Sequence, residues 1–181
     1  MIKEFKKYAG VKVLSYFLEN PSTEVHIKEL ARILKISPST SKRFCDLFTK
    51  ESILLSKKKS NSIFFSLNNE ESYVKELKRM YAVTLLSKNF NLKKEGIFNV
   101  SVYGSYASGD YSNNSDVDLI VISRAKNFDE AFISLFQKKI KKEVNVTKRT
   151  LSEWSQLKDD RDSFAEEILR NNFSLFGGKL K

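Results

Sequence analysis

The chain has 181 residues, enough for one large or two small domains. Its formal net charge of +10 favours polyanions such as nucleic acid as partners; the alternative is that the lysines only keep the surface soluble. Hydrophobic residues make up 41% of the chain while Gly (6) and Pro (2) are few, which predicts a packed core and excludes a disordered chain. A single Cys allows no internal disulfide, and no apolar run approaches the roughly 20 residues of a membrane helix. The polar start of the chain argues against export, so a cytoplasmic protein is expected.

The first third of the chain predicts helices, a short strand and a hairpin. Apolar residues recur at helical spacing from Phe5 to Leu18, and Pro21 breaks that helix. Ser37 can cap a later helix, and Pro38 suits its first turn. The other expected elements are a short strand over residues 24–27, helices over 28–35 and 38–52, and two strands joined by a polar turn over 53–67.

This order of elements resembles the winged helix-turn-helix family over residues 1–68. The resemblance implies DNA binding, with a recognition helix in the major groove and a hairpin on the phosphates. It also makes a homodimer an expected option. The alternative is a domain that dimerises or docks another protein, with its lysines solvated. The residues expected to contact nucleic acid are Ser39, Thr40, Lys42 and Arg43 on the helix and Lys57, Lys58 and Lys59 on the hairpin.

The rest of the chain predicts a bridging helix and then alternating strands and helices. Residues 69–90 form an amphipathic stretch without Gly or Pro, which we expect to be a helix between two domains. The expected boundaries are 1–69, a connecting helix at 70–92, and 93–181. The second domain is expected to contain strands over 99–104, 116–123 and 143–150, a helix over 128–142, a turn or short helix over 152–157, and a last helix from 162 that ends near 171–172 before an apolar tail.

Two aspartates stand one residue apart at the start of the strand "DVDLIVIS". Because side chains alternate across a strand, Asp116 and Asp118 point to one face, while Val117 and Leu119 point into the core. Two carboxylates this close repel each other, and one takes up a proton unless a cation lies between them. Hard oxygen ligands of this kind suit Mg²⁺ or Mn²⁺.

A Gly-Ser pair ends the preceding strand. Gly104 lets a phosphate approach the backbone closely, and the amides of a helix that starts at Ser105, with its hydroxyl, can donate to that phosphate. Asp110 and Ser115 are typical of turns, and Ser115 is a further candidate for contact with a nucleotide. A phosphate site that faces two metal-binding carboxylates fits nucleotidyl transfer.

Gly104 and Ser105, ten further residues, and then Asp116, Val117 and Asp118 followed by "LIVI" resemble the signature of the polymerase-beta-like nucleotidyltransferase superfamily. The segment is most similar to the small, minimal members of bacteria and archaea, and the resemblance covers roughly residues 97–181. It implies two Mg²⁺ or Mn²⁺ ions and an NTP substrate, with ATP expected.

The resemblance also implies a third carboxylate on a later strand. The matching residue is Glu143 in "KKEVNV", where many members carry Asp, and Asn145 shares its face. The alternative for Glu143 is a solvated residue that compensates neighbouring lysines. A second departure is that minimal members often carry Arg after Gly-Ser, where this chain has Tyr106 and Ser108.

The predicted fold class is α+β: an N-terminal winged helix-turn-helix domain and a C-terminal polymerase-beta-like nucleotidyltransferase α/β domain with a small mixed sheet. The predicted function is metal-dependent transfer of an NMP from an NTP to a hydroxyl acceptor, which could be a partner protein in a toxin–antitoxin pair, a small molecule or RNA. One alternative is a DNA-binding regulator with a nucleotide-sensing or inactive nucleotidyltransferase domain. Another is a module that binds a partner toxin without catalysis. His26, Cys45 and Trp154 are expected to be structural.

Overall fold

The computed structural model describes residues 7–92 and 95–180. The chain divides into two compact units, one that ends at Leu77 and one that begins at Lys78. Helix α5 (Ser72–Asn89) runs through this division. Within the described ranges, no helix combines the length and hydropathy needed to cross a bilayer.

The N-terminal unit contains the elements that the sequence predicts, in the predicted order. The start of the first helix at Phe5 lies outside the described residues. Antiparallel pairing joins the three strands in the order β1-β3-β2. The elements are α2 (Ala9–Glu19), β1 (Val25–His26), α3 (Ile27–Leu34), α4 (Pro38–Lys50), β2 (Leu54–Lys59) and β3 (Ser62–Leu67).

Short-range hydrogen bonds fix the starts of the helices in this unit. The Nδ1 atom of His26 accepts from the backbone N–H of Lys28 at 3.2 Å and caps α3, so His26 has the structural role that the sequence predicts. The Ser37 hydroxyl accepts from the N–H of Thr40 at 3.0 Å and caps α4. Cys45 is fully buried, and burial raises the pKa of its thiol to about 12, which makes it a core residue.

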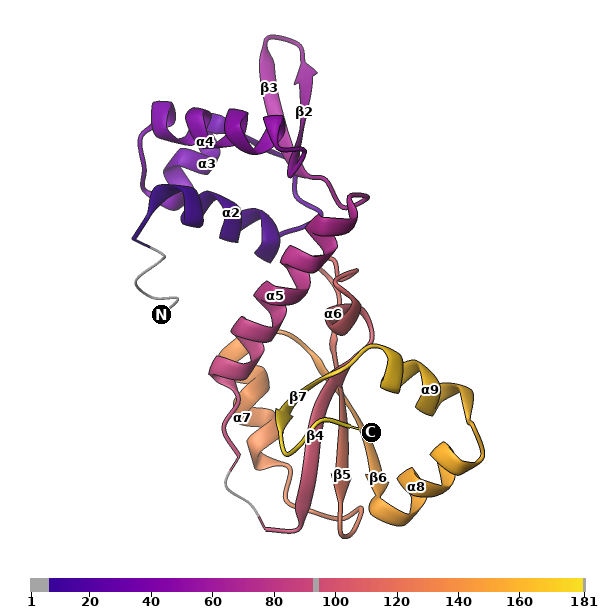
Figure 1. The fold of residues 1–181 in the computed structure, drawn as a ribbon. Coiled ribbons are helices and arrows are strands. Elements are labelled where there is room, and N and C mark those ends of the chain that lie inside the picture. Colours follow the sequence, from indigo (N-terminus) through magenta and orange to yellow (C-terminus); the bar gives the residue numbers. More distant parts are fainter. Residues whose placement is uncertain (1–6, 93–94, 181) are drawn as a thin grey trace. The chain divides into compact units, whose positions relative to one another are not determined.

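The C-terminal unit is built on a four-stranded sheet in the order β6-β5-β4-β7. β5 and β6 are parallel, whereas β4 pairs antiparallel with both β5 and β7, so the predicted small mixed sheet is confirmed. Figure 1 shows α7 on one side of this sheet and α8 and α9 on the other. The elements after α5 are β4 (Ile97–Tyr103), α6 (Ser105–Ser108), β5 (Val117–Ser123), α7 (Ala131–Ile140), β6 (Val144–Thr150), α8 (Leu151–Asp159), α9 (Ser163–Arg170) and β7 (Phe173–Phe176).

The apolar tail expected after the last helix is a strand. β7 pairs with β4, with Phe173 opposite Val102, and so covers an edge of β4 that would otherwise expose backbone donors and acceptors. The side chain of Asn99 on β4 is buried and donates to the carbonyl of Gly178 at 2.6 Å. The tail is therefore part of the sheet, which its sequence pattern alone did not predict.

The two faces of β5 pack against different layers. Val117, Leu119 and Val121 lie in one core cluster with α5 and α7, while Ile120 and Ile122 lie in another with Trp154 and the apolar face of α9. Because side chains alternate along β5, Asp118 projects toward the α8 and α9 side of the sheet.

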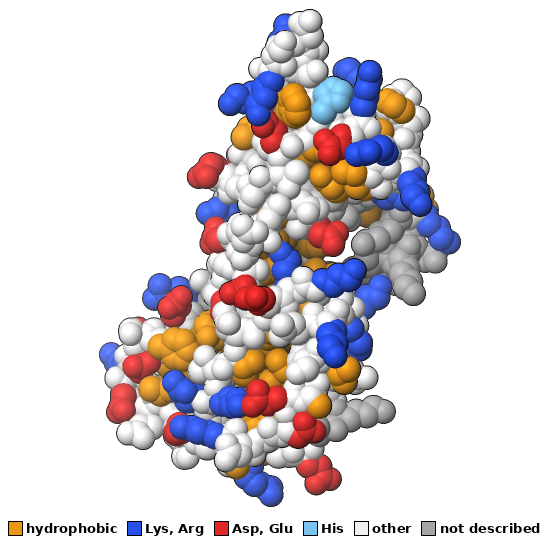
Figure 2. Space-filling model, turned by 180° about the vertical axis from the view of Figure 1, so that it is seen from behind, with side chains coloured by type: hydrophobic (Ala, Val, Ile, Leu, Met, Phe, Trp, Pro, Cys, Tyr) orange, Lys and Arg blue, Asp and Glu red, His pale blue; other side chains and the backbone are white. Residues whose placement is uncertain are grey.

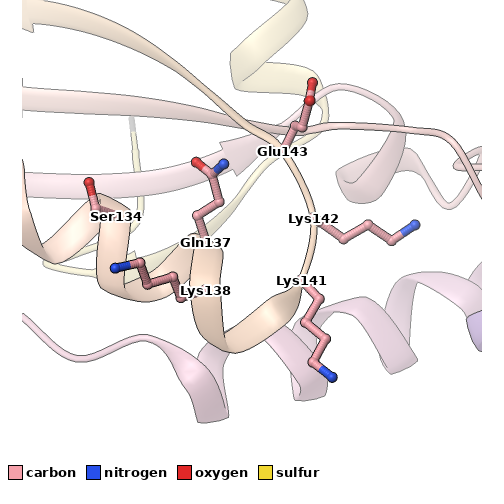
Figure 3. A pocket seen from close by; sticks show the side chains of 6 residues that line it. All are labelled: Ser134, Gln137, Lys138, Lys141, Lys142 and Glu143. Carbon is pink, nitrogen blue, oxygen red and sulfur yellow. The ribbon is translucent and has the colours of Figure 1, made fainter.

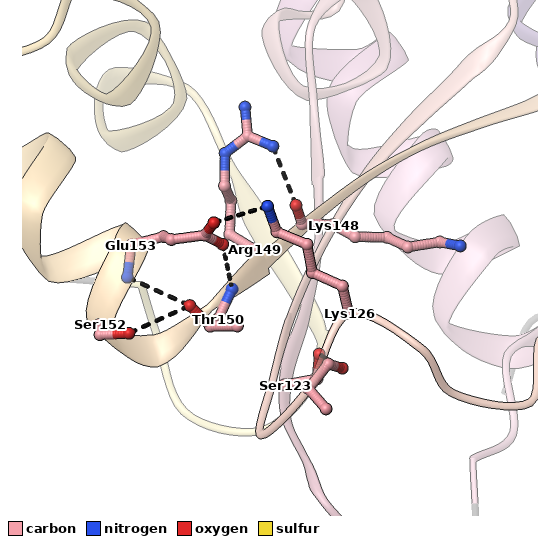
Figure 4. Close-up of polar contacts among 8 residues, drawn as sticks. Ser123, Lys126, Lys148, Arg149, Thr150, Ser152 and Glu153 are labelled. Carbon is pink, nitrogen blue, oxygen red and sulfur yellow. Dashed lines mark hydrogen bonds and ion pairs between the residues drawn. The ribbon is translucent and has the colours of Figure 1, made fainter.

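A network of polar contacts joins the end of β6 to α8. The Thr150 hydroxyl accepts from the N–H of Glu153, and the Glu153 carboxylate accepts from the N–H of Thr150, which together form a capping box (Figure 4). Lys126 also contacts this carboxylate at 2.5 Å. The Lys126 ammonium and the Thr150 amide lower the pKa of Glu153 to about 2. The predicted turn or short helix is thus a well-capped helix.

Candidate active site

Asp116 immediately precedes β5 and Asp118 lies on it, and both contact one residue of the neighbouring strand. That residue is Asn145 on β6, which pairs in parallel register with Asp118. Its side-chain Nδ2 lies 3.4 Å from Oδ2 of Asp116 and 3.3 Å from Oδ1 of Asp118. One amide group therefore donates to both carboxylates, and the three side chains form a single cluster.

The core determines which way the aspartates point. Val117 and Leu119 are fully buried, as the alternation predicts. The N–H of Val117 also donates to the carbonyl of Glu143 at 2.9 Å, which fixes the start of β5 against the start of β6. Since these valine and leucine side chains are held in the core, Asp116 and Asp118 must share the opposite face.

The pKa of Asp118 is raised above its ordinary value of 3.8. The largest cause is partial burial, which disfavours the charged carboxylate. The hydrogen bond from Asn145 acts in the opposite direction, and the negative charge of Asp116 adds to the rise. The pair is thus electrostatically unfavourable, and a bound cation would relieve it.

Gly104 makes room for the carboxylate of Asp118. It has φ +66° and ψ −148°, a conformation that is essentially restricted to glycine. A Cβ atom at this position would lie 2.6 Å from Oδ2 of Asp118. The carbonyl of Gly104 accepts from the amides of Ala107 and Ser108, each at 3.0 Å, and so starts the one-turn helix α6. The predicted helix after Gly-Ser is confirmed and begins beside the aspartates.

The side chain after Gly104 and Ser105 belongs to the core. Tyr106 is 4% exposed and stacks on Tyr111 with ring centroids 4.4 Å apart. Basic residues of α5, which the sequence predicts only as a connecting helix, also lie close to this region. The Lys78 ammonium lies 4.9 Å from the Tyr111 ring centroid, and Arg79 Nε donates to the carbonyl of Ala107 at 2.8 Å. Only the packing of α5 against α6 shows this, because the residues are far apart in sequence.

The segment before Asp116 is a braced turn. The N–H of Ser112 donates to the hydroxyl of Ser115 at 2.8 Å, which is the turn role expected of Ser115. Lys142 Nζ donates to the carbonyl of Asn113 at 2.5 Å. This lysine therefore holds the loop that leads into the aspartate pair. A contact between Ser115 and a nucleotide stays a prediction.

Glu143 is exposed and immediately precedes β6. It lines a cavity of about 590 Å³ whose other lining residues are Ser134, Gln137, Lys138, Lys141 and Lys142. Figure 3 shows Glu143 and Gln137 pointing to the same side, while Lys141 points to the opposite side and Lys142 points sideways. Over residues 7–92 and 95–180, no three or more His, Cys, Asp or Glu side chains gather closely enough to hold a metal ion. The structure thus brings Asn145 rather than Glu143 against the two aspartates, and the predicted role of Glu143 as a third ligand stays a prediction.

Comparison with known protein families gives a match in the C-terminal half of the chain. Residues 86–172 match the nucleotidyltransferase domain. This match includes the Gly-Ser pair, both aspartates and Asn145. The search of curated proteins gave no match.

Among solved structures, the chain is similar to a crystal structure described as a toxin-antitoxin with AMP-PNP. The similarity covers 56% of this chain and 74% of that chain, at 17% sequence identity and a TM-score of 0.34. A similarity this low supports no conclusion about the fold or the function of this chain.

The residues predicted to contact nucleic acid lie outside the nucleotidyltransferase domain, in the N-terminal unit. Figure 2 shows one face of the molecule, on which Lys and Arg side chains lie among acidic and hydrophobic ones. Lys42 pairs with Asp46 at 2.5 Å, and Lys59 pairs with Glu24. Thr40 is half-buried, and the exposed members of the predicted set are Ser39, Lys42, Arg43, Lys57, Lys58 and Lys59.

Replacing Gly104 should destabilise the nucleotidyltransferase domain. A non-glycine residue in this conformation costs about 1–3 kcal/mol, and the new methyl group of Gly104→Ala would also push Asp118 aside. We expect a lower free energy of unfolding in urea, followed by the fluorescence of Trp154, which is the single tryptophan and is buried. Gly178→Ala is the matched control, since nothing lies within 4 Å of its Cβ position. Equal stability of the two variants would contradict this account of Gly104.

Replacing Asp118 should stabilise the metal-free protein in a pH-dependent way. Because the folded-state pKa of Asp118 is raised, its ionised form lowers stability above that pKa, and the effect disappears as the pH falls toward 3.8. Asp118→Asn should therefore unfold at higher urea than the wild type at pH 7, with a smaller gain near pH 4. A gain that does not change with pH, or a loss at pH 7, would contradict the prediction.

Proposed function

We propose that this chain is a metal-dependent nucleotidyltransferase that moves an NMP from an NTP to a hydroxyl acceptor. The observation that supports this most directly is that Asp116, just before β5, and Asp118 on β5 both contact Asn145, with Gly104 directly against Asp118. The match of residues 86–172 to the nucleotidyltransferase domain supports nucleotidyl transfer as the reaction class.

The residues present fit a divalent cation. The donors are carboxylate oxygens, which suit Mg²⁺ or Mn²⁺, and the mutual repulsion of the pair favours a positive charge between them. The absence of a side chain at Gly104 keeps the space beside Oδ2 of Asp118 open. Asp116 and Asp118 would hold the cation, which when bound supplies charge stabilisation for the attacking and leaving oxygens.

The remaining residues of the cluster would bind and orient the nucleotide. Gly104 would allow a phosphate oxygen close to the backbone, and the hydroxyl of Ser105 at the start of α6 would donate to it. Ser115 at the loop before the aspartates is a further contact in this proposal. Glu143 is the candidate third carboxylate. ATP is the NTP to test first.

The acceptor in this proposal is a hydroxyl group. A partner protein in a toxin–antitoxin pair is the acceptor suggested by the resemblance to minimal nucleotidyltransferases, and its nucleophile would be a Ser, Thr or Tyr side chain. Small molecules and RNA are the other acceptor classes that carry suitable hydroxyl groups.

We also propose that the N-terminal unit is a winged helix that binds DNA. Its helix α4 begins at Pro38 with exposed Ser39, Lys42 and Arg43, and its hairpin presents Lys57 and Lys58 on the exposed strand β2. A helix of this kind can enter a major groove while the hairpin lysines contact phosphates.

A second candidate function is a DNA-binding regulator whose nucleotidyltransferase domain senses nucleotide or is inactive. The observation that favours it is the neutral Asn145 opposite Asp118. A domain that binds a nucleotide but transfers nothing would fit a site with only two acids.

Transfer activity separates the two candidates. Incubation of the full chain with Mg²⁺, each α-radiolabelled NTP and a cell extract should move label to an acceptor. Substitution of residues that only orient metal ligands costs about 10–100-fold, so Asp116→Asn and Asp118→Asn should each reduce labelling by more than about 100-fold. Asp159→Asn, an exposed aspartate on α8, is the control. Binding of ATP without any transfer by the wild type would support the regulator instead.

The salt dependence of DNA binding tests the N-terminal proposal. Each phosphate contact adds about 0.9 to the slope of log K against log salt, so Lys57→Ala combined with Lys58→Ala should reduce that slope by about 2. Fluorescence anisotropy with a labelled duplex measures it. The control is Lys88→Ala with Lys179→Ala, which removes the same charge from exposed positions outside the unit. An equal slope for both double variants would contradict direct phosphate contact by the hairpin.

A further inference from the structure

Asn145 occupies the position on β6 from which a side chain can face both aspartates. Parallel pairing sets it beside Asp118, and its amide reaches Asp116 as well, at 3.3 and 3.4 Å respectively. The resemblance to the family implies a third acid two residues earlier, at Glu143. In the structure that residue precedes β6 and lines the cavity with three lysines.

The chemistry of Asn145 differs from that of an acid in two ways. Its side-chain NH₂ has two donors, so it can give one to each carboxylate and reduce their repulsion without a proton or a metal ion. It also adds no negative charge. The cluster of Asp116, Asp118 and Asn145 therefore carries two charges, which one divalent cation neutralises.

A carboxylate at the same place would change the electrostatics of the cluster. Its oxygens would lie near those of Asp118, because adjacent strands are about 4.8 Å apart. Three acids would repel each other strongly in the metal-free protein, and would attract a cation more strongly than two. The residue at position 145 thus affects both the stability of the metal-free site and its affinity for divalent cations.

We infer that Asn145 is a positioning residue that holds Asp116 and Asp118 together in the metal-free protein and limits this site to one divalent cation. This inference rests on the proposed function, because it takes the aspartate pair to be a metal site. It differs from the two-cation site that the resemblance to the family implies. The structural basis is the β5–β6 register together with the two contacts of one neutral amide.

Binding of Mn²⁺ to the full chain, measured by electron paramagnetic resonance of the free ion, tests the inference without any activity assay. We expect one Mn²⁺ per wild-type chain. Asn145→Asp should bind Mn²⁺ at least about tenfold more tightly, or bind a second ion, because a third charge is added within a few ångströms. Asn171→Asp adds the same charge at an exposed position after α9 and should match the wild type.

Thermal unfolding gives a second readout. Without metal, Asn145→Asp should unfold at a lower temperature than Asn171→Asp, and added Mn²⁺ should remove that difference. Replacement of Glu143 by Gln should weaken Mn²⁺ binding much less than Asp118→Asn does. These comparisons separate the role of Asn145 from that of Glu143.

Several results would overturn the inference. They are two Mn²⁺ ions per wild-type chain, equal Mn²⁺ affinity of Asn145→Asp and Asn171→Asp, or an equal loss of binding in Glu143→Gln and Asp118→Asn. The wild-type stoichiometry decides the matter even if a variant does not fold. Binding of one Mn²⁺ with no transfer to any acceptor would instead reject the proposed transferase activity and leave the inference standing.

Discussion

The site depends on two carboxylates, those of Asp116 and Asp118, held side by side and partly buried. Their carboxylates share one face of a strand, and partial burial raises the pKa of Asp118. Such a pair adds no stability to the folded protein, and the proposed function gives it a role as the ligands of a cation. The amide of Asn145 reduces the cost of this pair by donating to both acids.

The rest of the C-terminal unit keeps the pair in place. Buried Val117 and Leu119 hold β5 in the core, and glycine at position 104 leaves space for Asp118. Lys142 braces the loop before Asp116 through the carbonyl of Asn113. Each contact stabilises the backbone around the acids while the carboxylates themselves stay half exposed. This is the arrangement expected of a preorganised binding site.

In the N-terminal unit, the residues predicted to bind a partner lie on the surface and not beside the core. Its core is formed by residues from α2, α3, α4 and the sheet, whereas its basic residues lie on the surface of α4 and β2. Some of these bases already have acidic partners, as Lys42 does in Asp46. Any polyanion would therefore compete with internal ion pairs for part of the basic surface, which lowers the share of the net charge available for binding.

The sequence by itself determined the local features of this protein. Period-two alternation placed the aspartates on one face, and the Gly-Ser pair predicted the turn into α6, because both depend on neighbouring residues. It also gave the order of the helices and of most strands. The Gly-Ser and Asp-x-Asp spacing was enough to predict the nucleotidyltransferase domain that the family comparison supports.

Only the tertiary structure decided which distant residues meet. The β5–β6 register sets Asn145 beside Asp118, β4 pairs with β7, and Tyr106 stacks on Tyr111 in the core. A pattern of alternating residues cannot give the register between two strands, since a shift of one residue exchanges which side chains face each other. For the same reason the sequence predicted only an apolar tail after α9, and the strand β7 is recognised only by its pairing with β4.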